Sequence, residues 1–221
     1  MVCREQKRQG TRKPMTVTEI KEVTKSRVKI EIDGEFAFVL YKGELRVYGI
    51  KENQEIGEDT YQEIITKVLP KRAKLRAMNL LKSRSYTAFQ LREKLRAGDY
   101  PEAIIEEAVA YVSSFGYIND EQYAIDFIEY NKERKSKNRI FMDLYQKGIA
   151  QAAVQQAWED VVGNNRQELE KEQILYWIQK KHFSVQTASL QEKQKMMAFL
   201  YRKGFANETI RSTLLLDITP I

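Results

Sequence analysis

The chain has 221 residues, of which 43% are apolar and 31% charged, enough apolar content to fold and too much for disorder. A net charge of +6 and a pI near 9.2 favour a polyanionic or acidic partner over a small neutral substrate. One cysteine (Cys3) and one histidine (His182) exclude a disulfide framework and any multi-histidine metal site. No apolar run nears the roughly 20 residues that span a bilayer, and residues 1–14 lack the apolar region of a signal peptide. We therefore expect a soluble, intracellular protein.

The first 70 residues predict a small β-rich module behind a basic, flexible N-terminus, residues 1–14. Apolar and polar residues alternate over 16–23 and 27–33, the period of half-buried strands, and a further run follows over 35–41. Asp33-Gly34 lies between two of these runs and predicts a type I′ hairpin turn. A helix is expected over 56–69, and Pro70 marks the expected boundary of the 15–70 module.

After Pro70 the period becomes helical and the sequence repeats itself. Leu95-Arg-Ala-Gly-Asp-Tyr100, Leu144-Tyr-Gln-Lys-Gly-Ile149 and Leu200-Tyr-Arg-Lys-Gly-Phe205 share a leucine, a glycine and a large apolar residue. Gly98, Gly148 and Gly204 are placed to end helices in the left-handed conformation. Such spaced self-similarity is typical of a repeat protein.

Capping residues complete the predicted repeats, because Thr87, Asn119 and Ser189 each precede Gln or Glu by three positions. We therefore expect nine helices in three repeats, over 72–84, 88–97, 102–115, 120–134, 138–147, 151–162, 167–181, 190–203 and 207–216. The predicted domains are 71–118, 119–163 and 164–221. Such short helices need packed neighbours, so the expected fold is mainly α, a tandem array of three three-helix repeats forming an elongated, curved molecule.

Three runs in this array resemble the RecX family: Tyr86-Thr-Ala-Phe-Gln-Leu-Arg-Glu-Lys-Leu95, Phe115-Gly-Tyr-Ile-Asn-Asp-Glu-Gln-Tyr-Ala124 and Arg139-Ile-Phe-Met-Asp-Leu-Tyr-Gln-Lys-Gly-Ile149. The resemblance covers residues 72–216, and the strand-rich stretch is similar to an N-terminal extension of longer members. It implies a cytoplasmic bacterial regulator that docks in the groove of the RecA–DNA filament and usually inhibits its ATPase and strand exchange.

Catalytic patterns are missing from the sequence. There is no phosphate-cradling glycine loop, and neighbouring acids such as Glu106-Glu107 and Asp120-Glu121 point in different directions on a helix. His182 follows two lysines at a helix end, where a cation complements the helix dipole. No enzyme activity, metal or other cofactor is expected.

Two basic blocks are the candidate binding sites: residues 70–96 carry nine basic residues and one acidic one, and residues 131–139 carry five and one. The alternative for either block is a solvated helix face. Aromatic residues are expected mainly in the core, and Tyr130 beside Lys132 is the nearest approach to a base-stacking pattern. The candidate partner-binding residues are Arg72, Lys74, Arg76, Arg84, Arg92, Lys94, Arg96, Lys132, Arg134, Lys135, Lys137 and Arg139.

Two hypotheses follow. The first is a monomeric regulator that binds the RecA filament through its repeat array, with possible direct contact to single- or double-stranded DNA and none to a membrane. The second is a stand-alone, non-specific DNA-binding helical module. Three repeats with only two basic blocks favour an extended protein groove over a single DNA site.

Overall fold

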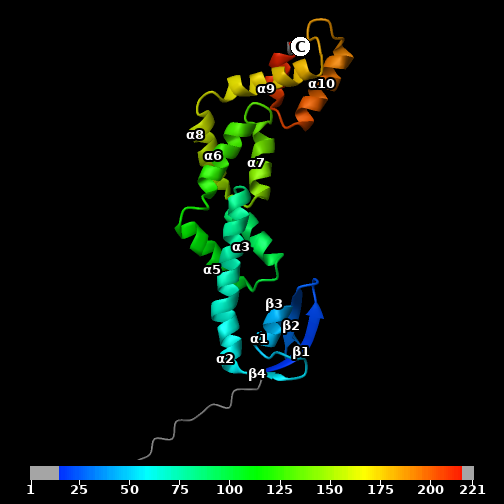
Figure 1. Ribbon diagram of the computed structural model, residues 1–221. Coiled ribbons are helices and arrows are strands. Elements are labelled where there is room, and N and C mark those ends of the chain that lie inside the picture. Colours follow the sequence, from blue (N-terminus) through cyan, green and yellow to red (C-terminus); the bar gives the residue numbers. More distant parts are fainter. Residues whose placement is uncertain (1–14, 216–221) are drawn as a thin grey trace, which may run out of the picture. The chain divides into compact units, whose positions relative to one another are not determined.

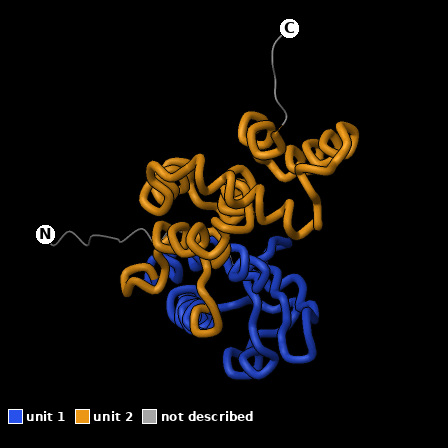
Figure 2. Tube along the Cα trace, turned by 90° about the horizontal axis from the view of Figure 1, so that it is seen from above, with its two compact units in different colours: residues 1–80, 92–112 blue, residues 81–91, 113–221 orange. Residues whose placement is uncertain are grey.

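The computed structural model describes residues 15–215, so Cys3, the expected basic N-terminus and the end of the last expected helix lie outside the described residues. Figure 1 shows a short β-rich segment followed by a succession of helices. The Cα positions form two compact units, coloured separately in Figure 2. Unit 1 contains the described residues up to Leu80 together with Arg92–Val112, and unit 2 contains Leu81–Leu91 and the residues from Ser113 onward.

Unit 1 contains an antiparallel sheet in the order β3-β2-β1-β4. Its strands are β1 (Met15–Glu22), β2 (Arg27–Ile32), β3 (Glu35–Tyr41) and β4 (Glu55–Ile56). The predicted hairpin is confirmed, since Asp33 and Gly34 have φ of 52° and 84° between paired strands. Alternation along β2 buries Val28, Ile30 and Ile32. The sequence prediction missed β4 and the short helix α1 (Lys42–Val47).

Pro70 does not end a helix, and the helix end expected at residue 69 is corrected. The module boundary at Pro70 stays a prediction. Helix α2 (Glu58–Glu63), the π-helical turn η1 (Ile64–Val68) and α3 (Leu69–Ser83) follow one another without a break. Proline removes an N–H donor and clashes with the preceding turn of an α-helix, and the wider π turn before it accommodates both defects.

The other helices agree with the predicted ones to within a few residues. They are α4 (Ala88–Arg96), α5 (Glu102–Ser114), α6 (Asp120–Asn131), α7 (Lys137–Gln146), α8 (Gln151–Val162), α9 (Arg166–Lys180), α10 (Leu190–Arg202) and α11 (Asn207–Thr213). Gly148 and Gly204 have φ of 80° and 90° as predicted, whereas at the first repeat the positive φ belongs to Asp99 and not to Gly98. Gly98 is instead confined by space, because a Cβ there would lie 3.0 Å from the carbonyl oxygen of Leu95.

The second and third repeats, both in unit 2, each bury an apolar core. Ile128, Ile140, Leu144 and Trp158 belong to the first of these cores. Ile174, Leu200, Phe205 and Ile210 belong to the other. Since each repeat closes its own core, the contacts that join repeats can be small and polar.

Two such joints in unit 2 have the same design. The Thr87 hydroxyl, at the start of α4, donates to the Lys147 carbonyl oxygen at the end of α7 (2.6 Å). The Ser136 hydroxyl, at the start of α7, donates likewise to the Lys203 carbonyl oxygen after α10 (2.6 Å). Each hydroxyl also accepts from a backbone N–H of its own helix, from Gln90 and Arg139 respectively. One buried hydroxyl thus satisfies two helix ends at once.

The start of α10 has no such partner. The Ser189 hydroxyl is exposed and pairs only with Glu192, in the predicted capping box. In the first repeat, within unit 1, the Gly98 carbonyl accepts instead from the Arg27 guanidinium of β2 (2.6 Å). The strand module therefore occupies the helix end that, in later repeats, receives the preceding repeat.

This difference gives a matched pair of substitutions. Ser189→Ala should lower the free energy of unfolding by roughly 1 kcal/mol, the ordinary cost of losing an N-cap. Thr87→Ala should cost about 1–3 kcal/mol more, because it also leaves the buried carbonyl of Lys147 without its donor. Urea unfolding of both variants measures the difference, and equal losses would show that the joint contributes nothing.

Candidate partner-binding surface

Four of the nine cations of the first basic block are already paired inside unit 1. Four of the seven candidate residues there form ion pairs: Arg72 with Glu44 (2.5 Å), Lys74 with Glu107 (2.7 Å), Arg92 with Glu106 (2.6 Å) and Arg96 with Glu102 (2.6 Å). The Arg92 guanidinium, bonded to both carboxylate oxygens, holds the pKa of Glu106 below its usual range. These side chains stabilise the unit and have less charge to offer a partner.

Arg72 is the most firmly held of the four. It also donates to the Val39 carbonyl oxygen (3.1 Å), and its guanidinium lies 4.6 Å from the ring centroid of Tyr41. It thus ties α3 to the strand module. Arg84, in unit 2, stacks on the ring of Tyr86 at 4.5 Å.

Arg76 and Lys94 are exposed and have no ion-pair partner among the described residues. Both line a hollow of about 400 Å³ in unit 1, together with Arg72 and Tyr100. Burial raises the pKa of the Tyr100 hydroxyl, although Arg72 and Arg27 oppose that effect. This hollow lies beside the contact of the strand module with α3.

The second basic block has a different environment. Lys132 pairs with Glu129 (2.7 Å), and Lys135 and Arg139 share the carboxylate of Asp143 at 2.9 and 3.0 Å. Arg134 is exposed and has no ion-pair partner within residues 15–215. The block therefore keeps a net positive charge after its internal pairs are counted.

A basic hollow of about 550 Å³ in unit 2 brings this block together with the third repeat. The second repeat contributes Arg134, Lys135, Ser136 and Arg139, and the third contributes Tyr176, Trp177, Lys180, Arg202, Lys203 and Phe205. Six cations line it, and the described lining residues include no carboxylate. We call this set the basic hollow.

Sequence reasoning missed the half of the basic hollow that comes from the third repeat. In the sequence, the spacing of Trp177, Lys180 and the Arg202-Lys203 pair is the signal of this half. These residues meet the second block only through the joint between Ser136 and Lys203, which lie 67 residues apart in the chain. Tyr130, the nearest approach to a base-stacking pattern in the sequence, is 78% exposed and does not line this hollow.

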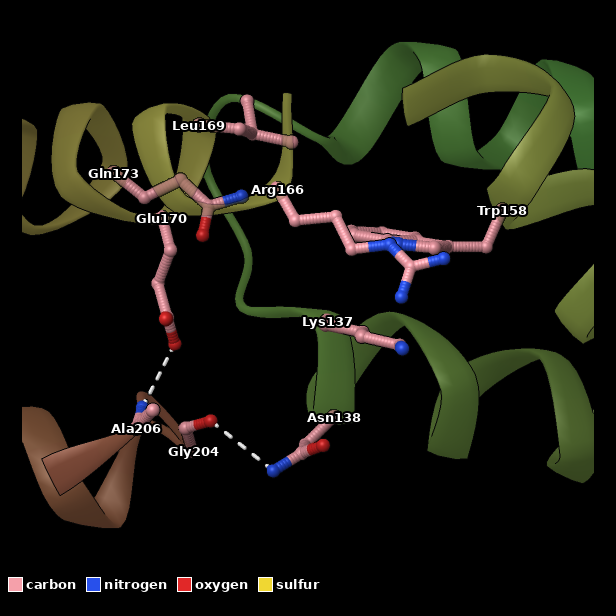
Figure 3. A pocket seen from close by; sticks show the side chains of 9 residues that line it. All are labelled: Lys137, Asn138, Trp158, Arg166, Leu169, Glu170, Gln173, Gly204 and Ala206. Carbon is pink, nitrogen blue, oxygen red and sulfur yellow. Dashed lines mark hydrogen bonds between the residues drawn. The ribbon is translucent and has the colours of Figure 1, made fainter. Parts of the chain in front are cut away.

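Lys137 points elsewhere, toward a smaller hollow of about 220 Å³ (Figure 3). Its Nζ lies 5.6 Å from the ring centroid of Trp158, whose buried Nε1–H has no hydrogen-bond partner. The other polar groups there are occupied: Glu170 accepts from the Ala206 N–H (2.8 Å), and Asn138 donates to the Gly204 carbonyl oxygen (3.2 Å). Figure 3 shows both bonds: that of Asn138 links the second repeat to the third, whereas that of Glu170 lies within the third repeat. Since residues of both repeats line this hollow, we assign it to the joint.

Asp120 and His182, for which the sequence predicts no catalytic or metal-binding role, lie at helix ends. Asp120 accepts from the Ala88 N–H (2.9 Å) and so supports the start of α4. His182 is exposed after α9, with φ of 50°. Within the described part of the chain, no three His, Cys, Asp or Glu side chains could hold a metal ion together. None of the described helices combines the length and the apolar character needed to span a bilayer.

Comparison with known families gives three matches in chain order. Residues 73–111 match the description "RecX, first three-helix domain", residues 119–157 the second and residues 168–214 the third. The chain belongs to the RecX family. The mainly helical fold class and the three tandem three-helix repeats predicted from the sequence are thereby confirmed.

The relatives extend this match beyond the repeats. A regulatory protein RecX of Caldanaerobacter subterraneus is 32% identical over 196 residues, covering 88% of this chain and 95% of that protein. A regulatory protein RecX of Clostridioides difficile is 28% identical and covers 85% of this chain and 88% of its own length. A crystal structure of regulatory protein RecX is similar in fold, with a TM-score of 0.59, 22% identity and coverage of 92% of this chain and all of that one. All three are named as regulatory proteins.

Proposed function

We propose that this chain binds the RecA filament as a monomer in the bacterial cytoplasm and inhibits the ATPase and strand exchange of the recombinase. The proposal rests on membership of the RecX family and on the basic hollow, where cations of two repeats meet without internal carboxylate partners for most of them. A filament of protein and DNA offers acidic side chains and phosphates to such a surface.

Inhibition without catalysis requires differential binding. A protein that binds one conformational state of the filament more tightly shifts the population toward that state. If ATP turnover needs the filament to move between states, stabilising either one lowers the rate. The repeat array supplies several separate contact points for this purpose, so the expected effect is on turnover and not on nucleotide binding itself.

A titration of ATPase activity on preformed RecA filaments tests the proposal. We expect a saturable fall in ATP hydrolysis that weakens as salt rises. A pull-down of RecA in the absence of DNA identifies a direct protein contact. Unchanged hydrolysis at saturating protein, with no RecA retained, would contradict the proposed function.

A further inference from the structure

The basic hollow concentrates unpaired cations of the described chain. Lys135 and Arg139 share Asp143, but Arg134, Lys180, Arg202 and Lys203 have no carboxylate partner within residues 15–215. These four residues lie in the segment before α7, in α9 and at the end of α10. The fold therefore brings positive charges of three chain segments together. Such a gathering opposes folding unless an anion neutralises it.

The joint holds the two halves of the basic hollow in place. Ser136, one of the lining residues, is 2% exposed and donates to the carbonyl oxygen of Lys203, another lining residue. Gln173 of α9 donates in addition to the Lys132 carbonyl oxygen. The cations are therefore presented by a fixed backbone frame, although their side chains can still move.

Aromatic faces lie in the same hollow, under the cations. The Nζ of Lys203 is 4.5 Å and that of Lys180 is 5.1 Å from the ring centroid of Trp177, which packs edge-on against Phe199 and Tyr176. Trp177 and Tyr176 are partly exposed. A planar ligand that displaced the flexible lysine ammonium groups could stack on these rings while its anionic group bound the arginine guanidinium groups.

Size and chemistry together select the ligand class. A hollow of about 550 Å³ falls within the roughly 300–1,000 Å³ that small ligands occupy. An acidic peptide would use the cations but has no need of the rings, and a duplex keeps its bases stacked inside. A phosphate joined to an unstacked base uses both features, as in proteins that bind single strands.

We infer that the basic hollow binds a nucleotide unit, with its phosphate held by Arg134, Arg139 and Arg202 and its base stacked on Trp177. The unit can belong to a single-stranded nucleic acid or to a free nucleotide. This inference goes beyond the proposed function, because the binding needs no recombinase.

The first test measures binding of a fluorescently labelled single-stranded oligodeoxythymidylate to the full chain by anisotropy, without RecA, at several salt concentrations. Arg134→Ser combined with Arg202→Ser should weaken binding about tenfold and reduce the slope of log K against log salt by about 1.4, the value for two lost phosphate contacts. The control is Lys171→Ser with Lys195→Ser, which removes the same charge from exposed positions of α9 and α10 outside the hollow.

Asp143→Asn should act in the opposite direction and tighten binding of the strand, since it releases Lys135 and Arg139 from their shared carboxylate.

The second test reports on stacking. The chain has two tryptophans, so Trp158→Phe leaves Trp177 as the only tryptophan emitter. The oligonucleotide should quench its emission, a duplex of the same length should quench it less, and polyglutamate should not quench it. Thymidine monophosphate as a competitor distinguishes the two sources: displacement at concentrations similar to those of the strand identifies a free-nucleotide site, and displacement only at far higher concentrations identifies a strand site.

Three outcomes would overturn the inference: no binding of the strand, equal weakening in the hollow and control variants, or equally tight binding of polyglutamate with no change in Trp177 emission. The last would assign the hollow to an acidic protein surface. Melting temperatures of all variants confirm that each is folded. RecA is absent from both tests, so their failure leaves the ATPase titration to decide the proposed function separately.

Discussion

Gly148→Ala should lower the free energy of unfolding by about 2–5 kcal/mol, the largest single-residue effect expected in unit 2. Gly148 has φ of 80°, where an L residue with a Cβ costs about 1–2 kcal/mol. A Cβ there would also overlap the Cβ of Phe89 at the joint between α4 and α7, and overpacking of this kind costs roughly 1–3 kcal/mol. Urea unfolding followed by circular dichroism measures the loss.

Gly116 provides the matched control. It has φ of 71°, but a Cβ added to it would meet no atom within 4 Å. Gly116→Ala should therefore cost only the backbone strain, and the difference from Gly148→Ala isolates the steric contribution of the joint. Phe89→Ala, added to Gly148→Ala, should restore part of the lost stability. Equal losses at the two glycines, or no recovery with the smaller side chain, would show that α4 and α7 do not depend on this close contact.

Local signals made most of the fold predictable from the sequence. Asp33-Gly34 specifies its turn through backbone conformation alone, and Thr87 and Ser189 form their predicted capping boxes with Gln90 and Glu192. Asn119 forms only half of its box, because the Gln122 side chain bonds to Asp126 instead. Such signals act within four residues and need no knowledge of the rest of the chain.

Two predictions failed although the features that decide them are also local. Proline ends helices in most local contexts. Here the π-helical turn before Pro70 accommodates its missing N–H donor and its steric clash. Gly98 was assigned a left-handed conformation that Asp99 adopts, because packing against Tyr100 and not φ requires the glycine. In both cases the deciding feature is local backbone geometry or packing that sequence periodicity does not reveal.

Only the part of the candidate site that comes from the second repeat was predictable from the sequence. Charge counting found the blocks at 70–96 and 131–139, but counting along the chain does not show which cations meet a carboxylate in space. Glu102, Glu106 and Glu107 come from the acidic stretch after the first block and pair with it. The second block gains Lys180, Arg202 and Lys203 across a joint instead. The two blocks look alike in sequence and differ in the charge that the fold leaves available.

That difference predicts which block acts on the filament, if the proposed function holds. Replacing four cations of the basic hollow with serine should raise the concentration of protein that halves RecA-filament ATPase activity. The four are Arg134, Arg139, Arg202 and Lys203. Exposed ion pairs contribute about 0.2–1 kcal/mol each, so four together amount to roughly 1–4 kcal/mol, or between fivefold and several hundredfold in concentration. Lys132 is left in place because Glu129 already neutralises it.

A control with the same change in charge replaces exposed lysines outside both hollows: Lys25, Lys51, Lys171 and Lys195. It should inhibit nearly as well as the unmodified chain, because distant exposed charges are screened at physiological salt. Both variants are measured at two salt concentrations after their melting temperatures have been compared, and the hollow variant should show the weaker salt dependence. Full inhibition by a folded hollow variant would remove the basic hollow from the filament contact. Arg76 and Lys94, two unpaired cations of the first block that line the hollow in unit 1, would then be the next residues to replace. Arg72 is held by the strand module and cannot be changed without destabilising unit 1.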